Sequence, residues 1–384
     1  MDFQDPLPTR QLAMKFSLVG PVYPYRGGIA HYTASLASAL IQHNHTVQTI
    51  SFKKQYPSWL YPGASDKDPS QKALSTPAEF ILDPFLPWTW EKAFRAIHTK
   101  HPNLVITQWW TTFWAFPFAY LNARLWKAGI KTAYLIHNVI PHEERTWDKW
   151  LAKLALKQGA EFIVQTQSEA ERLSKLINNN NIHLCELPPY FGLKTELIEQ
   201  EDARKELNLP QGHKIFLFFG IIRPYKGLQV LIDAFNELQK TNTNTHLLIA
   251  GEFWENKSAY LNQIRQYGLI DQVTLIDEYI PNERLPVIFA AADCLVAPYT
   301  GGTQSAVVGL GIAYGLPTIV TEHLAAGISK ENRKHVAIIP AQDCEELTSK
   351  MIEIIYQVRP SPVQSEDQIN GWDTLVKTIE QMAE

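Results

Sequence analysis

The sequence predicts an α/β protein with two Rossmann-like, doubly wound domains that face each other across a cleft. Two observations carry this prediction. Apolar stretches of strand length alternate with amphipathic stretches of helix length, and this alternation restarts at about residue 212. The length of 384 residues also suits two domains of roughly 150–200 residues each.

Composition and charge narrow the classes of function. The net charge of −4 and the pI near 6.3 indicate no overall basic field, so we expect no nucleic-acid partner. Cys185, Cys294 and Cys344 are too widely spaced for a disulfide framework or a metal knuckle, which favours a cytoplasmic location. The polar, proline-containing start resembles neither a signal peptide nor a membrane anchor.

The first predicted strand, Lys15 to Val19, runs into a glycine-rich turn and then a helix. Gly27 and Gly28 stand at the helix start, where adjacent glycines let backbone approach a ligand phosphate or sugar closely. Their spacing differs from the GxGxxG fingerprint, which argues against a dinucleotide cofactor. The predicted apolar side of this helix carries Leu36, Leu40 and Ile41.

A second strand, Thr46 to Phe52, precedes a long loop over residues 54–77 that is rich in Pro, Ser, Gly and Asp. Loops of this length in a compact domain are usually functional or mobile. The loop contains a DxD match, Asp66-Lys67-Asp68, a pattern that can hold the metal of a diphosphate. Such a short acidic match arises easily by chance, and we expect no metal site there.

An aromatic stretch surrounds the next strand, Leu104 to Thr107. Its rings are Trp88, Trp90, Trp109, Trp110, Phe113, Trp114, Phe116, Phe118 and Tyr120. We expect most of them to pack in the core around the next helix. Nearby cations such as Lys92, Arg95 and Arg124 leave a second interpretation open, in which the rings contact a membrane surface or stack on a sugar.

The strand Thr132 to Ile136 delivers His137 to its carboxyl end. In parallel sheets this end borders the ligand crevice, where an imidazole can bind a substrate hydroxyl or exchange a proton near neutral pH. His142 and Glu143 resemble half of a zinc motif, but Thr146 stands where the second histidine of HExxH is required. We therefore predict no zinc site.

A hinge is predicted at Pro188-Pro189-Tyr190-Phe191-Gly192, with the domain boundary at about 190–212. The predicted domains are an N-terminal unit over 14–195 and a C-terminal unit over 205–362. The last segment, 363–384, has helical spacing of Trp372, Leu375, Ile379 and Met382.

The stretch FLFFGIIRPYKGL, Phe216 to Leu228, carries the strongest candidate site. An uncharged apolar run ends at Gly220 and helical spacing begins at Leu228, so a strand meets a helix here. Arg223 and Lys226 stand at this junction, where a helix start offers free N–H groups to an anion. A planar guanidinium fork beside a compact ammonium suits the two phosphates of a diphosphate, although taken alone the pair also fits two solvated loop cations.

A second polar, glycine-rich loop, Pro298 to Ser305, follows the strand Cys294 to Ala297 and precedes another helix. Thr303, Gln304 and Ser305 can place hydroxyl and amide groups on the same ligand phosphates. Taken alone, the loop fits an ordinary helix N-cap equally well.

These features together resemble glycosyltransferase family 4 of the GT-B fold. The resemblance spans nearly the whole chain from Met14, and its most specific parts are RPYKG and the block ADCLVAPY…GLPTIVT. It implies transfer of a sugar with retention from a nucleotide sugar, such as a UDP- or GDP-sugar, to a hydroxyl of a glycan, glycolipid or small molecule. It implies no required metal or other cofactor. It also places the acceptor on the N-terminal domain and the donor on the C-terminal domain, with the last helix packing back on the N-terminal domain.

The resemblance further implies roles for individual residues. Arg223 and Lys226 would hold the diphosphate, His137 would contact the transferred sugar, and Gly27 and Gly28 would border the donor phosphates and the acceptor. The nucleobase would meet the backbone near Tyr279 and Ile280. The other implied donor-binding residues are Glu252, Gly302, Thr303, Gln304 and Ser305.

One pair of positions departs from the family pattern. The family typically carries two glutamates eight positions apart around the final glycine-rich loop, and this chain has Gly302 and Leu310 there. Neither side chain accepts a hydrogen bond. Three alternatives stay open: a diverged enzyme in which Gln304 and its neighbours contact the sugar, an inactive nucleotide-sugar-binding or scaffold protein, and a GT-B sugar epimerase.

Overall fold

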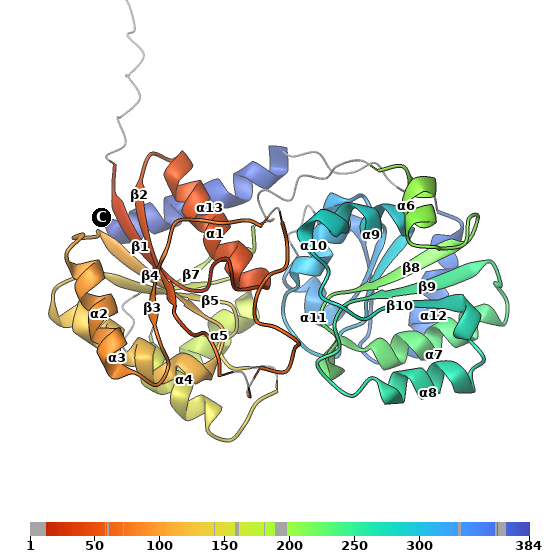
Figure 1. Cartoon of the computed structure of the whole chain (residues 1–384), viewed down its shortest axis with the longest axis horizontal. Helices are drawn as coiled ribbons and strands as arrows, with labels where there is room; N and C mark the ends of the chain where they lie inside the picture. The colour runs from red at the N-terminus through yellow and green to blue at the C-terminus, as the bar shows by residue number, and fades with distance from the viewer. Residues whose placement is uncertain are drawn as a thin grey trace, which may run out of the picture.

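The computed structural model describes residues 13–57, 59, 61–71, 73–141, 143–157, 161–179, 181–188, 198–328, 332–357, 359 and 366–384. The predicted hinge at Pro188-Pro189-Tyr190-Phe191-Gly192 lies, except for its first residue, outside the described residues, as does His142. The described chain forms two α/β halves that lie side by side (Figure 1).

The described part of the first half holds a seven-stranded parallel sheet in the order β3-β2-β1-β4-β5-β6-β7. Its strands are β1 (Lys15–Val19), β2 (Thr46–Phe52), β3 (Glu79–Leu82), β4 (Leu104–Trp109), β5 (Thr132–Ile136), β6 (Glu161–Val164) and β7 (Ile182–Leu184). Its helices are α1 (Gly28–Gln42), α2 (Pro87–His98), α3 (Ala115–Lys127), α4 (Asp148–Leu156) and α5 (Gln167–Ile177), with a 3-10 turn η2 (Thr112–Trp114).

In the second half, the described residues form a six-stranded parallel sheet in the order β10-β9-β8-β11-β12-β13. Its strands are β8 (Lys214–Phe219), β9 (Thr245–Ala250), β10 (Val273–Ile276), β11 (Cys294–Ala297), β12 (Thr318–Thr321) and β13 (Val336–Ile339). The helices are α6 (Gln200–Glu206), α7 (Leu228–Gln239), α8 (Ser258–Gln266), α9 (Leu285–Ala291), α10 (Ala306–Ala313), α11 (Glu322–Ala325) and α12 (Cys344–Ile355). A last helix, α13 (Glu366–Ala383), follows the second half in sequence. The 3-10 turns are η3 (Pro224–Lys226), η4 (Ile270–Gln272), η5 (Asn282–Arg284) and η6 (Asn332–His335).

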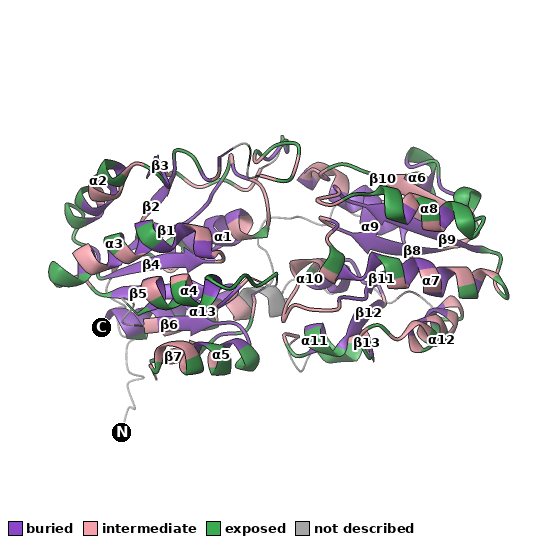
Figure 2. Cartoon of the chain, turned by 90° about the horizontal axis from the view of Figure 1, so that it is seen from below, coloured by how far each residue is buried: buried purple, intermediate pink, exposed green. Residues whose placement is uncertain are grey.

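Each sheet is buried between two layers of helices, which explains why its strands are apolar on both faces. In β8, Phe216 and Phe218 join the core cluster that contains α7, whereas Ile215 and Leu217 join the cluster that contains α9. Successive side chains of a strand point to opposite faces, so one uncharged run supplies both cores. Figure 2 shows buried strands at the centre of both halves. The predicted fold class, two doubly wound Rossmann-like halves with the GT-B architecture, is confirmed.

The last helix, α13, packs against the first half although it follows the second half in sequence (Figure 1). Trp372 is 1% exposed, and its ring centre lies 5.2 Å from that of Tyr32 on α1. Near the end of α13, a carboxylate oxygen of Glu380 lies 2.7 Å from Nε2 of His45. These contacts tie the end of the chain to the first sheet.

Several predicted elements differ from the structure. β4 continues to Trp109, beyond the predicted end at Thr107, and β3, whose first two residues are exposed, was not predicted. Ile41, expected on the apolar side of α1, is about half exposed because it lies at the end of that helix.

The aromatic stretch divides into two groups. Trp109, Trp114 and Phe118 are fully buried, as expected of core residues. Trp88 and Phe116, in contrast, expose more than half of their surface. For these two residues the core interpretation was wrong.

Replacing Trp372 by Ala should destabilise the first half, because it leaves a large cavity between α13 and α1. We expect a loss of about 3–5 kcal/mol in the free energy of unfolding, measured by urea denaturation. Lys377→Ala, an exposed position on the same helix, is the matched control and should change stability by less than about 0.5 kcal/mol. A Trp372→Ala protein as stable as this control would show that α13 is not part of the cooperative core.

Candidate functional site

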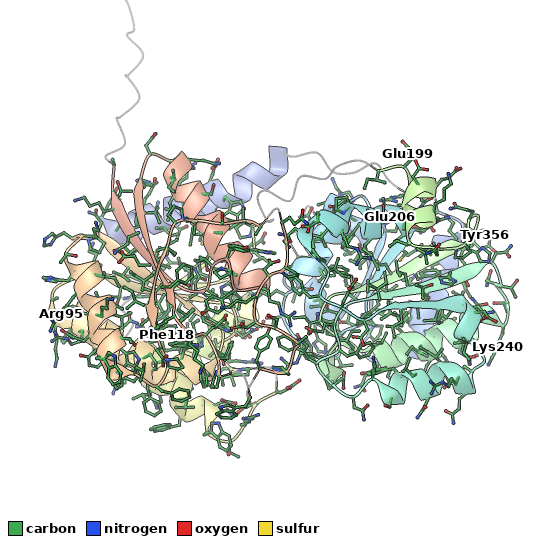
Figure 3. The ribbon with its side chains drawn as sticks, in the orientation of Figure 1. Arg95, Phe118, Glu199, Glu206, Lys240 and Tyr356 are labelled. Atoms are coloured by element: carbon green, nitrogen blue, oxygen red, sulfur yellow. The ribbon has the colours of Figure 1, made fainter. Side chains whose placement is uncertain are left out.

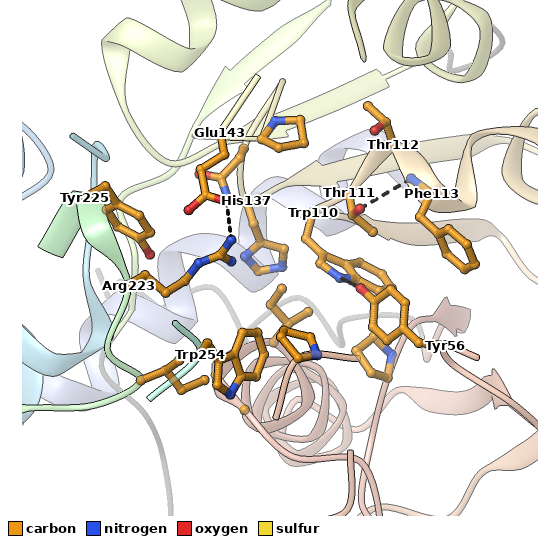
Figure 4. A pocket seen from close by; sticks show the side chains of 18 of the residues that line it. Tyr56, Trp110, Thr111, Thr112, Phe113, His137, Glu143, Arg223, Tyr225 and Trp254 are labelled. Carbon is orange, nitrogen blue, oxygen red and sulfur yellow. Dashed lines mark hydrogen bonds and ion pairs between the residues drawn. The ribbon is translucent and has the colours of Figure 1, made fainter. Parts of the chain in front are cut away.

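A cleft with a volume of about 990 Å³ lies between the two halves (Figure 4). On the first half it is lined by loops that follow β1, β4 and β5, and on the second half by loops that follow β8 and β11. Parallel sheets bind ligands beyond the carboxyl ends of their strands, and here two such ends share one space. The volume is at the upper end of the usual range for small-molecule sites.

The structure brings seven of the predicted site residues to this cleft. They are Gly27, Gly28, His137, Arg223, Lys226, Gln304 and Ser305. The other four, Glu252, Ile280, Gly302 and Thr303, do not line it. Ile280 packs into the core of the second half, so any ligand contact there would have to use its backbone.

The glycine turn of the first half places a helix start at the cleft. Gly27 has φ 104°, in the region that favours glycine, and no side chain caps α1, which begins at Gly28. Both glycines line the cleft. A helix start without a side-chain cap leaves backbone N–H groups available to an anionic ligand.

The turn between β8 and α7 fixes the two predicted phosphate cations. Arg223 and Lys226 flank the 3-10 turn η3, and Gly227 follows with φ 72°. A Cβ atom at Gly227 would lie 2.0 Å from the carbonyl oxygen of Pro298, so only glycine fits this close approach. The turn is therefore packed rigidly against the loop that follows β11.

Lys226 is a buried cation at the cleft. Its side chain lies under the ring of Tyr299, with Nζ 5.2 Å from the ring centre, and the residue is 8% exposed. Burial lowers the pKa of Lys226, and the neighbouring Arg223 lowers it further, whereas Tyr225 raises it. Within the described part of the chain no carboxylate pairs with this ammonium group. A buried cation is costly without a counter-charge, so this position favours an anionic ligand.

Arg223 extends across the cleft and forms an ion pair with a residue of the first half. Its Nη2 lies 2.5 Å from Oε2 of Glu143, which belongs to the loop after β5 in the first half (Figure 4). The guanidinium carbon also lies 5.8 Å from the ring centre of Trp254. Both partners are partly exposed, so a phosphate can compete with Glu143 for the guanidinium group.

His137 stands at the end of β5, as predicted, and its imidazole is buried. Its Nε2 lies 2.7 Å from Oε1 of Gln108, and its ring meets that of Tyr32 edge to face. Burial lowers the pKa of His137 to about 3. The imidazole is therefore neutral near pH 7, which suits a hydrogen bond to a sugar hydroxyl better than proton transfer.

Gln304, before the start of α10, links the two halves. Its Nε2 donates a hydrogen bond of 2.9 Å to the carbonyl oxygen of His137. Its Oε1 is buried and has no hydrogen-bond partner among the described residues. The amide oxygen of Gln304 is thus an unused acceptor at the cleft, next to the position predicted to contact the sugar.

At the two positions where the family typically has glutamates, the local structure does not suit a glutamate side chain. Gly302 has φ 97°, a conformation that a glutamate would adopt only with strain. Leu310 packs against the core cluster around β8 and α9. A glutamate at either position would therefore need a different local backbone or core.

Sequence reasoning missed Arg26, which crosses the cleft. Its guanidinium group forms an ion pair with Glu252 of the second half and a hydrogen bond of 2.8 Å to the hydroxyl of Tyr61. Glu252 also accepts hydrogen bonds from the backbone N–H of Ala64 at 2.7 Å and from Nε1 of Trp254 at 2.8 Å. These contacts occupy Glu252, one of the predicted donor-binding residues. A cation directly before Gly27 was the signal in the sequence.

Two general properties of the described residues complete the site. None of their helices combines the length and the apolar character needed to cross a bilayer. No three His, Cys, Asp or Glu side chains of the described residues are gathered as metal ligands, and Asp68 of the DxD match contacts His31 at 3.2 Å and the backbone N–H of Ser70 at 2.9 Å.

Comparison with other protein sequences finds relatives that are named as glycosyltransferases or sugar-transferring synthases. The chain is 28% identical over 223 residues to a putative glycosyltransferase, YtcC, of Bacillus subtilis, covering 52% of this chain and 53% of the relative. It is 24% identical over 277 residues to mannosylfructose-phosphate synthase of Agrobacterium fabrum, covering 62% of this chain and 60% of the relative. The matches thus span between half and two thirds of these relatives.

Among solved structures, Anabaena Alr3699/HepE in complex with UDP and glucose superposes with a TM-score of 0.71 at 14% identity. The superposition covers 96% of this chain and 100% of that chain, and at this identity it supports the fold alone. Two family models match the sequence: "Glycosyltransferase Family 4" over residues 26–185 and "Glycosyl transferases group 1" over residues 213–357. Because these matches cover both halves of the GT-B fold described above, the chain belongs to the family 4 glycosyltransferases.

Proposed function

We propose that the protein transfers a sugar from a nucleotide-sugar donor, a UDP- or GDP-sugar, to a hydroxyl of a glycan, glycolipid or small-molecule acceptor. The observation that carries this proposal is Lys226, a buried ammonium group at the cleft with no paired carboxylate in the described chain. Arg223 and the starts of α1 and α10 face the same cleft and favour negative charge there. A diphosphate supplies the missing counter-charge.

The family and its relatives support this choice of ligand. The Anabaena neighbour was solved with UDP and glucose, and the Agrobacterium relative is named as a synthase of mannosylfructose phosphate. We propose that the second half binds the donor, because Arg223 and Lys226, in the turn after β8, and the polar loop after β11 all belong to this half. The first half would then hold the acceptor.

The proposed reaction breaks the bond between the anomeric carbon and the β-phosphate oxygen, and the electron pair leaves with the phosphate. Arg223, Lys226 and the backbone N–H groups of the helix starts stabilise that charge, so we propose that no metal is required. The acceptor oxygen attacks from the same face, and its proton passes to the leaving phosphate. This route gives retention without a carboxylate nucleophile.

Two groups are placed to hold the transferred sugar in this reaction. The neutral imidazole of His137 and the unused Oε1 of Gln304 both belong to cleft-lining residues. We propose that they bind sugar hydroxyls in place of the contacts that the family obtains from its glutamates.

We also propose that the protein works in the cytoplasm with peripheral membrane contact through its first half.

A second candidate is an inactive nucleotide-sugar-binding or scaffold protein of the same fold. Gly302 and Leu310, in place of two glutamates, are the observation that favours it. Hydrolysis of the donor in the absence of acceptor separates the two candidates, because only an active enzyme releases free sugar.

The phosphate site is tested by calorimetric titration with UDP, GDP and ADP, with and without magnesium. We expect selective binding that does not need magnesium. Arg223→Ala and Lys226→Ala should each weaken it by about tenfold or more, since each removes a charged contact worth about 1.5–3 kcal/mol. Lys240→Ala, an exposed lysine of the same half, is the control. Unchanged affinity in both cleft variants would remove the diphosphate site.

The role of His137 is tested by separating binding from turnover. His137→Ala should lower kcat more than it weakens nucleotide binding, because the imidazole is proposed to contact the sugar. The wild-type kcat should show no inflection from this residue between pH 5 and 8, since its pKa of about 3 keeps it neutral. His98→Ala, on the exposed end of α2, is the control. Equal losses of binding and turnover in His137→Ala would assign it a structural role.

A further inference from the structure

Besides Trp126 near the end of α3, six large aromatic side chains of the first half expose more than half of their surface. We call them the aromatic rim: Trp59, Phe85, Trp88, Phe116, Trp147 and Trp150. Their exposed fractions range from 53% to 80%. Single exposed apolar residues are ordinary, but a group of this size in one half marks an interaction surface.

Part of the rim borders the cleft, and two ring contacts connect its members to one another or to the cleft lining. The ring centres of Phe116 and Trp150 lie 6.0 Å apart, which joins α3 to α4. Phe85 lies 6.1 Å from Phe113, a residue that lines the cleft. Phe116 and Trp147 line the cleft themselves. Phe85, Phe116 and Trp147 therefore place this part of the rim at the first-half side of the cleft.

The position of the rim follows from the fold. Trp88, Phe116, Trp147 and Trp150 stand in the first turns of α2, α3 and α4 or directly before them. These helices lie side by side on one face of the first sheet (Figure 1). Their first turns follow the carboxyl ends of the strands, which is the edge that the cleft uses.

Cations accompany the rim in a protein that is acidic overall. Exposed basic residues of the same elements and loops are Lys53, Lys54, Lys92, Arg145, Lys149 and Lys153. Of the nearby acidic groups, Glu144 pairs with Lys149 at 3.1 Å, Glu91 pairs with Arg124 at 3.2 Å, Glu143 pairs with Arg223, and Asp148 is buried. The local excess of positive charge thus contrasts with the net charge of −4.

We propose that the aromatic rim docks the protein on an anionic phospholipid membrane. Indole rings favour the headgroup level of a bilayer, and lysines beside them attract anionic headgroups. A soluble glycan is the less suitable occupant, because Trp59, Trp88 and Trp150 do not line the cleft and cannot stack on a sugar bound there. With the mouth of the cleft at the bilayer, the acceptor would be carried by a lipid. This last step rests on the proposed function.

The test is sedimentation of the full chain with vesicles of phosphatidylcholine, with or without phosphatidylglycerol. We expect the protein to sediment with the anionic vesicles, and added salt to weaken this binding. Trp88→Ala combined with Trp150→Ala should lower the vesicle partition coefficient by about tenfold or more, since two indole rings can no longer insert into the bilayer. Lys149→Glu combined with Lys153→Glu should abolish the preference for phosphatidylglycerol.

A matched control lies on the opposite half of the molecule. Tyr356→Ala combined with Lys240→Glu removes one exposed aromatic ring and reverses one charge there, at positions labelled in Figure 3. This control should bind vesicles like the wild type. Nucleotide binding without vesicles should be the same in all variants, because none of the changed residues lines the cleft.

The outcomes separate the two proposals. Wild-type protein that stays in the supernatant with both vesicle types overturns the docking surface, and so does equal loss of binding in the rim and control variants. If vesicle binding follows the rim but no nucleotide binds, docking stands and the proposed transferase function fails.

Discussion

An ion pair between Arg26 and Glu252 crosses the cleft, and the geometry of the site depends on it. Both side chains are nearly buried, so the pair is screened little by solvent. Arg26 directly precedes the glycine turn at the start of α1, and Glu252 directly follows Gly251 at the end of β9. The pair therefore sets the distance between a helix start on one half and the edge of the sheet on the other.

The loop after β2 joins the same connection. The backbone N–H of Ala64 donates to Glu252, and further along the loop Oγ of Ser70 accepts from the backbone N–H of Asn282 at 2.9 Å. A long loop of the first half thus lies along the second half. These contacts cover the region near Tyr279, whose ring lies 4.9 Å from the guanidinium carbon of Arg26. A nucleobase at that position would have to share it with Arg26 and this loop.

The cleft has different chemistry on its two sides. The second half contributes cations and a helix start, which favour an anion, and Lys226 is buried so deeply that solvent gives it little compensation. The first half also contributes a cation, Arg26, and the start of α1, and it adds aromatic side chains, some within the cleft and others exposed beside it. The proposal of a nucleotide-sugar donor on the second half and an acceptor on the first half rests on the buried cation Lys226 and on these aromatic side chains.

The sequence by itself determined the fold and the positions of the main site residues. An uncharged run such as Ile215 to Phe219 is stable only between two helix layers, and glycine at Gly220 and Gly227 marks the turn that holds Arg223 and Lys226. The placement of His137 at a strand end followed from the same rule, since parallel strands share one carboxyl edge. These features depend on residues close together in the sequence, so they can be predicted from the sequence alone.

Only the tertiary structure decided which groups meet across the cleft. No spacing rule relates Arg26 to Glu252 or Arg223 to Glu143, because the two halves approach through side chains far apart in sequence. The sequence also did not predict which aromatic side chains are exposed to solvent. Trp114 and Phe116 are two positions apart, yet Trp114 is fully buried and Phe116 is exposed. The reason is that Trp114 faces the sheet from the turn before α3, whereas Phe116 lies on the opposite side of the chain, and composition cannot distinguish those directions.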